Sequence, residues 1–189
     1  MVFKHILATM GMCMAASAIG TSVTAQQVST NVVADKTDWT VFVEDDPKEC
    51  WGVSAPKETV NTRDGRVVAV RRSDILLFVF YRPDADVKGQ VTFTGGYPFA
   101  EGSTVNLNIG GTEFELMTVP NDPDTPSDDR EWAWAVTSSD DAKIVTAMKR
   151  GTQAVLTGRS ARGTQTKDTF SLLGFTAAIE DAEQRCGSN

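Results

Sequence analysis

Three groups of side chains in this sequence have types and spacing that could do chemistry: two cysteines, two tryptophans and a cluster of basic residues. The stretch "ECWGVSAP" carries Cys50, and Cys186 lies near the other end of the chain. A thiolate can act as a nucleophile, a metal ligand or a redox group, whereas two cysteines can also form a disulfide. The choice among these roles depends on the compartment to which the protein goes.

The first 25 residues have the pattern of a secretory signal peptide. Lys4 supplies a positive start, residues 6–19 are uncharged and mostly apolar, and the small residues of "SVTA" precede a cleavage point after Ala25. The apolar run is too short for a membrane span, and "TMGM" before Cys13 lacks the small residues of a lipoprotein cleavage site. We therefore expect a signal peptide over 1–25 and a mature chain over 26–189. That chain would be periplasmic, associated with the outer membrane or secreted, and it has no further transmembrane segment.

Cleavage also removes His5, the only histidine of the chain. Ser-His-Asp and Cys-His catalysis, as well as histidine-dependent zinc sites, are thereby excluded. No phosphate-binding loop, dinucleotide fingerprint or nucleophile elbow is present, and no spacing singles out a pair of carboxylates for acid–base work. The Pro- and Asp-rich segment 119–130 lacks the glycine and the terminal glutamate of an EF-hand calcium loop. We expect a protein that is not an enzyme and that uses no cofactor or metal.

For the two cysteines of the mature chain, an exported protein favours a structural disulfide. Cys50 and Cys186 would then join the two ends of one domain. Two thiolates without histidine make a poor metal site, and their spacing is not that of a Cys-x-x-Cys redox motif. A free reactive thiol and a redox function stay open as the weaker alternatives.

The remaining candidates for ligand contact are aromatic and basic. In "EWAWAV", Trp132 and Trp134 share one face of a strand, where an exposed pair could stack on sugar rings. Tryptophans that face the core of a β-sandwich are the more frequent arrangement. In "GRSARGTQTKDT", the basic residues Arg159, Arg162 and Lys167 could bind an anion, although such groups are common in polar connections that bind nothing.

The charge of the mature chain limits its partners. Without the first 25 residues it has 17 basic and 25 acidic residues, a net charge of −8. Binding to nucleic acid or to anionic lipid relies on clustered Lys and Arg. We therefore expect no nucleic acid among its partners, which would be envelope or host proteins.

Short strand-like segments dominate from Trp39 onward. The clearest is "TVNLNIGGTEFELMT" (104–118), in which apolar and polar residues alternate on both sides of Gly110-Gly111, as in a β-hairpin. The continuously apolar "ILLFVFY" (75–81) predicts a central strand that is buried on both faces. "RVVAV" (66–70) follows an Asp-Gly turn and predicts a further strand.

Two helices interrupt the strands. The first is predicted to start with Ser139 as its cap and to stop at Gly151. The second runs from Phe175 to about Arg185. The fold class is therefore all-β. We expect an immunoglobulin-like β-sandwich of about nine strands with one internal and one C-terminal short helix, in a single domain over 26–189.

Several of these segments resemble the invasion-associated locus B family over essentially the whole mature chain. The resemblance is carried by "CWGVSAPKE" (50–58), "GYPFAEGS" (96–103), "IGGTEFEL" (109–116), "DDAKIVTAMKRG" (140–151) and "GRSARGTQTKDTFSLLGF" (158–175). It implies a small exported β-sandwich protein of the Gram-negative envelope, with no catalytic residues and with the Cys50–Cys186 disulfide. The family is named for host-cell entry by a pathogen. "RRSD" has Ser73 where many members have glycine, so an integrin-like Arg-Gly-Asp is absent, and the 119–130 loop is longer than usual; both departures count against host adhesion. The expected function is binding through protein contacts, in host association or envelope stress; the alternative is a module that binds a glycan or an anion.

Overall fold

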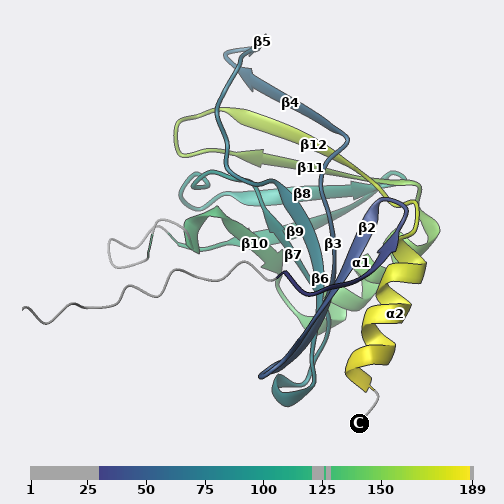
Figure 1. The fold of residues 1–189 in the computed structure, drawn as a ribbon. Helices are drawn as coiled ribbons and strands as arrows, with labels where there is room; N and C mark the ends of the chain where they lie inside the picture. The colour runs from purple at the N-terminus through teal and green to yellow at the C-terminus, as the bar shows by residue number, and fades with distance from the viewer. Residues whose placement is uncertain (1–29, 121–125, 127–128, 188–189) are drawn as a thin grey trace, which may run out of the picture.

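The computed structural model describes residues 30–120, 126 and 129–187 (Figure 1). Twelve strands in this part of the chain form one antiparallel sheet in the order β1-β2-β3-β6-β7-β10-β9-β8-β11-β12-β4-β5. The strands are β1 (Val32–Lys36), β2 (Trp39–Asp45), β3 (Lys48–Ser54), β4 (Glu58–Arg63), β5 (Arg66–Val67), β6 (Leu76–Arg82), β7 (Val87–Thr94), β8 (Thr104–Ile109), β9 (Thr112–Thr118), β10 (Trp132–Ala135), β11 (Gln153–Arg159) and β12 (Gln165–Ser171). The helices are α1 (Ser138–Arg150) and α2 (Phe175–Gly187), with short 3₁₀ turns η1 (Pro83–Ala85) and η2 (Asp129–Glu131).

The sheet bends into two arms. The strands of the first arm, β1-β2-β3-β6-β7, run steeply in Figure 1, and those of the second, from β8 to β4, lie across them. The inner faces of the arms meet in the core, where Phe93 of β7 packs edge-on against Phe170 of β12 with ring centroids 6.1 Å apart. The all-β, sandwich-like prediction with two short helices is confirmed. The strands exceed the expected number chiefly because β1 and β4 have no apolar pattern of their own.

The predicted hairpin at 104–118 is observed as β8–β9, with Asn108 opposite Glu113 and Leu107 opposite Phe114. Residues 66–70 extend for only two residues as β5, so that prediction was too long. The prediction that residues 75–81 are buried on both faces needs a correction at β6. Its residues Leu77, Val79 and Tyr81 enter the core, whereas Phe78 and Phe80 lie on the opposite face of the sheet, and Phe80 is partly exposed.

α1 packs against β7 at the end of the first arm. Its cap is Thr137 rather than Ser139, because the Thr137 hydroxyl accepts a hydrogen bond from the Asp140 amide at 3.2 Å. Asp141 accepts a bond from the Val91 amide of β7 at 2.8 Å, which ties the helix to the sheet. Gly151 ends the helix as predicted.

α2 covers the inner face of β2 and β3. A methyl group on Gly52 would lie 2.8 Å from Cδ1 of Ile179, so a larger residue at this position would require the Ile179 side chain to shift. The chain enters α2 through Gly174, whose φ of +87° and close approach to the Lys36 carbonyl both require glycine. Trp39 then packs edge-on against Phe175, with ring centroids 4.9 Å apart.

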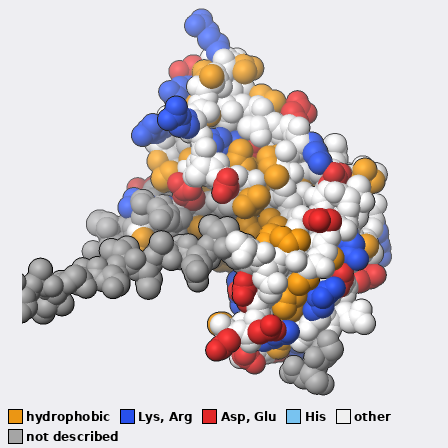
Figure 2. Space-filling model, viewed as in Figure 1, with side chains coloured by type: hydrophobic (Ala, Val, Ile, Leu, Met, Phe, Trp, Pro, Cys, Tyr) orange, Lys and Arg blue, Asp and Glu red, His pale blue; other side chains and the backbone are white. Residues whose placement is uncertain are grey.

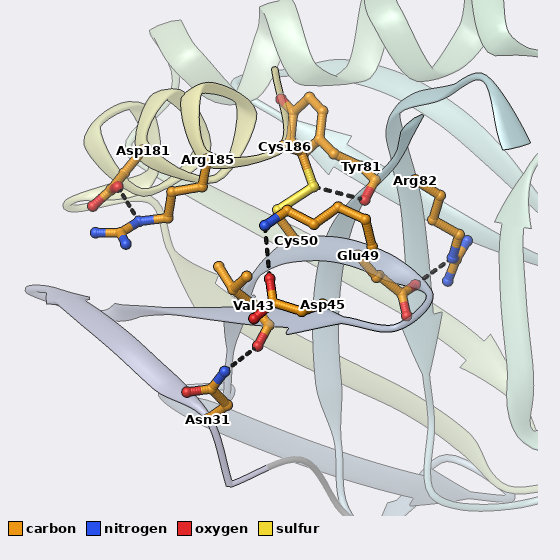
Figure 3. The surroundings of a disulfide bond; sticks show 11 residues. Asn31, Val43, Asp45, Glu49, Cys50, Tyr81, Arg82, Asp181, Arg185 and Cys186 are labelled. Atoms are coloured by element: carbon orange, nitrogen blue, oxygen red, sulfur yellow. Dashed lines mark hydrogen bonds and ion pairs between the residues drawn. A yellow bond between two sulfur atoms is a disulfide. The ribbon is translucent and has the colours of Figure 1, made fainter. Parts of the chain in front are cut away.

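The end of α2 is joined to β3 by a disulfide between Cys50 and Cys186, as predicted (Figure 3). Both cysteines are buried. The Cys186 sulfur lies 3.5 Å from the carbonyl oxygen of Tyr81 on β6. The bond therefore fixes the C-terminal helix to the centre of the first arm, and Cys50 is a structural residue.

Two predictions concern segments outside the described residues. The signal peptide over 1–25 is one of them, and most of the 119–130 loop is the other. Among the residues that the structure does describe, no helix has the length and apolar character needed to cross a membrane.

Candidate binding surfaces

A row of aromatic rings lies on the outer face of the first arm, the face that α2 does not cover. Successive ring centroids are 5.3 Å apart for Phe42–Trp51, 5.9 Å for Trp51–Phe80, 5.2 Å for Phe80–Phe78 and 5.6 Å for Phe78–Trp132. Trp134 follows two residues after Trp132 and lines a hollow with it. We call these residues the aromatic face: Phe42, Trp51, Phe78, Phe80, Trp132 and Trp134.

Strand register places the rings side by side. Phe42 pairs with Trp51, and Trp51 pairs with Phe80. Between β6 and β10, strand β7 contributes short polar side chains, so Thr92 stands directly between Phe78 and Trp134. Side chains of successive residues in a strand point to opposite faces of the sheet. Because the paired residues of neighbouring strands point to the same face, every ring of the row lies on the same side of the sheet.

The tryptophans occupy the less frequent of the two arrangements considered for them. Ala133 and Ala135 of β10 point into the core and are buried, whereas Trp132 and Trp134 lie on the outer face and remain partly exposed. The interpretation as core residues was wrong. The inner side of β10 packs close to α1 and the core, where methyl side chains fit and indole rings do not.

Charged groups border the rings. The guanidinium of Arg82 lies over Phe80, with 4.4 Å from Cζ to the ring centroid. It is held there by an ion pair with Glu49, visible in Figure 3, and by a 2.8 Å hydrogen bond to the side-chain oxygen of Gln90. A cation over a ring is attracted by the negative face of the π-system. Figure 2 shows that, on the side in view, hydrophobic side chains gather near the middle of the molecule, with charged ones around them.

A hollow of about 310 Å³ lies between Arg82, Gln90 and the two tryptophans. A second hollow, of about 270 Å³, lies on the other side of the same tryptophans, next to Val119 and Asp129. Trp132 and Trp134 thus present their rings to two adjacent depressions.

The structure separates the three predicted basic residues. Arg162 lines a cavity of about 490 Å³ at the end of the second arm. Arg159 and Lys167 alternate with buried neighbours on β11 and β12, so both point to the outer face of that arm. The cavity instead gathers Arg162 with Arg63, Arg71 and Arg72, three arginines that sequence reasoning did not single out.

The buried carboxylates have structural partners. Asp168 is fully buried and accepts two hydrogen bonds from Arg72, at 2.8 and 2.6 Å. Burial raises the pKa of Asp141, while the hydrogen bond from the Val91 amide acts in the opposite sense. Both carboxylates hold elements of the fold together through these hydrogen bonds.

Comparisons with known proteins agree with this architecture. The family described as invasion associated locus B (IalB) protein matches residues 39–183. The fold is similar to the crystal structure of invasion associated protein b from Bartonella henselae, with a TM-score of 0.51 and 18% sequence identity. The alignment covers 79% of this chain and 94% of that one. No curated protein matches the sequence significantly. The family match spans most of the chain, including the strands of the aromatic face, and the chain belongs to the invasion associated locus B family.

Proposed function

We propose that this protein is exported to the envelope and acts there without catalysis, by binding another protein through its aromatic face. The N-terminal sequence supports export, because it has the pattern of a cleaved signal peptide. The disulfide supports an oxidising compartment.

The observation that carries the proposal is the row of rings on the outer side of the sheet. An antiparallel sheet with one solvated face normally alternates apolar inward and polar outward residues. Here β2, β3, β6 and β10 place aromatic residues outward, and Phe42, Phe80, Trp132 and Trp134 retain exposed surface. Met117 of β9 pairs with Trp134 and extends the apolar surface, since the residue is 45% exposed. Connected apolar surface of this kind marks interaction sites.

The composition of the surface favours a protein partner. The side chains of Phe42, Phe78 and Phe80 carry no polar atom, and Arg82 with Glu49 supplies a charged border. An apolar centre rich in aromatic residues and a polar rim are typical of protein–protein interfaces. Tryptophan and arginine are also the residues that most often dominate binding energy there.

A second candidate function rests on the hollow between Trp132 and Trp134. Gln90 and Thr92 place hydrogen-bonding groups beside the two indoles, the combination that a small polar ring such as a sugar requires. Titration with envelope saccharides, followed by tryptophan fluorescence, tests this candidate. Saturable quenching would assign a saccharide site, and an unchanged spectrum would leave the protein partner as the function.

Capture experiments with matched variants test the proposal. The wild-type protein, Trp134→Ala and Val155→Ala are immobilised and exposed to a solubilised envelope fraction. Val155 lies on the outer face of β11, away from the aromatic face, and serves as the control. Loss of a central tryptophan from an interface lowers affinity by about tenfold or more. Equal capture of one protein by wild type and Trp134→Ala would refute the proposal.

A further inference from the structure

A cavity of about 490 Å³ lies where residues 69–72, the turn at Gly96–Pro98 and the start of β12 come together. Four of its lining residues are arginines: Arg63, Arg71, Arg72 and Arg162. Its volume is in the range of sites that bind small molecules. Which molecule could bind depends on how many of the four guanidinium charges are already compensated by a neighbouring carboxylate.

Arg72 forms the floor and is already neutralised. Its side chain is 5% exposed, and it makes a two-pronged ion pair with the buried Asp168. Its Nε donates to the Gly95 carbonyl at 2.8 Å, and its guanidinium lies 4.9 Å from the centre of the Tyr97 ring. These contacts use its donors and fix it in place, so Arg72 holds the cavity in shape.

The other three arginines keep their charge. Arg63 donates from both Nε and Nη2 to the hydroxyl of Thr164, at 3.1 and 2.6 Å, and a neutral hydroxyl does not compensate a cation. Arg71 and Arg162 are exposed, and neither has an ion-pair partner in the described part of the chain. Glu131 also lines the cavity, and its carboxylate accepts a hydrogen bond from Ser73.

The described lining residues therefore leave a net charge of about +2, from three guanidinium groups without an ion-pair partner among the described residues and one carboxylate. Tyr97 adds no charge, because burial raises its pKa to about 12. Like charges around one cavity repel one another, and a bound anion would relieve this cost. Guanidinium groups match the oxygens of phosphate with paired hydrogen bonds.

We propose that this cavity binds a phosphate monoester, whose charge of about −2 near neutral pH matches that of the cavity. Arg71 and Arg162 would contact the phosphate from the open side, and Arg63 from the side of Thr164. The remaining volume takes the polar group that carries the phosphate, next to Ser160 and Thr166. The site is separate from the aromatic face, and the proposal does not depend on a protein partner.

Isothermal titration with glycerol 3-phosphate tests the proposal. Arg71→Gln and Arg162→Gln should each weaken binding by about tenfold, since each removes a charge-assisted contact. Arg159→Gln and Lys167→Gln remove the same charge from the outer face and should bind like the wild type. Thermal unfolding of each variant checks that the fold is intact.

Two results would overturn the proposal: no binding of glycerol 3-phosphate by the wild type at millimolar concentration, or equal weakening by the four variants, which would indicate a general charge effect. Vesicles of phosphatidylcholine with and without phosphatidic acid distinguish the source of the phosphate. Retention on the phosphatidic acid vesicles would assign a lipid headgroup, and binding of the free ester alone would assign a soluble molecule.

Discussion

Replacing both Cys50 and Cys186 by alanine is expected to lower the free energy of unfolding by about 5 kcal/mol. The two residues are 136 positions apart in sequence. A cross-link over a loop of that length removes much of the conformational entropy of the unfolded chain. Alanine is the appropriate replacement, because both positions are buried and a serine hydroxyl there would need a hydrogen-bond partner.

The single variants sharpen this prediction. Cys50→Ala and Cys186→Ala each break the same bond, so each should lose most of the stability that the double variant loses. Additive losses would mean that the two sites contribute separately, through packing. α2 is expected to stay docked in the native state of all three variants, because Ala178, Ile179 and Ala182 remain buried against the sheet.

Guanidinium-induced unfolding, followed by tryptophan fluorescence, measures these differences. Reductant present throughout the transition should destabilise the wild type to the level of the double variant and should leave the double variant unchanged. A loss below about 1 kcal/mol in the double variant would refute the reasoning from loop closure. Two free thiols in the native, unreduced protein would refute the disulfide itself.

Three other predictions concern the buried carboxylates and the N-terminus. Asp168→Ala leaves a buried arginine without its partner and should cost about 3–5 kcal/mol in chemical unfolding; a loss below about 1 kcal/mol would contradict a buried ion pair. Asp141→Asn keeps an acceptor for the Val91 amide and removes a carboxylate whose pKa is raised by burial. Because the folded state holds the proton more tightly than the unfolded state, wild-type stability falls as the pH rises through the raised pKa. The stability of Asp141→Asn relative to wild type should therefore be greatest at neutral pH and should decline as the pH is lowered toward the ordinary carboxyl pKa. The opposite trend in unfolding measured as a function of pH would contradict this. Intact mass of the protein from the periplasmic fraction should correspond to a chain that begins at Gln26, whereas a lipid on Cys13 or a retained leader would contradict export by signal cleavage.

The elements that the sequence predicts well are those with a local pattern. The hairpin at 104–118 follows from strict alternation and a Gly-Gly turn, and its register is observed. β1 and β4 were missed because "VVADK" and "ETVNTR" alternate too little to indicate strands. These segments form strands because they pair with β2 and β12, an interaction that the local sequence does not indicate.

Side-chain orientation is the part that the sequence could not decide. Alternation places Trp132 and Trp134 on one face, but which face is inner depends on what packs against β10. The small residues Ala133 and Ala135 were the available signal, since a crowded inner face selects small side chains. Phe78 and Phe80 lie within a continuously apolar segment, and such a segment is also typical of a strand that is buried on both faces. The sequence therefore does not indicate that these two side chains point outward.

The arginine-lined cavity is a purely tertiary feature. Arg63 is the last residue of β4, Arg71 and Arg72 precede β6, and Arg162 lies between β11 and β12. These segments meet only when β4 pairs with β12 at the far end of the sheet. Sequence proximity grouped Arg162 with Arg159 instead, although strand alternation sends Arg159 to the other face.

The central claim is that a protein partner docks on the aromatic face, and site-specific photo-cross-linking in the cells that make the protein tests it most directly. A benzophenone side chain is introduced at Met117, beside Trp134, or at Val67, which is 77% exposed on β5, the last strand in the sheet order. The account predicts one discrete, protease-sensitive adduct from position 117 that is lost when Trp134→Ala is added, and no such adduct from position 67. Adducts of equal yield from both positions, or none from position 117, would contradict it.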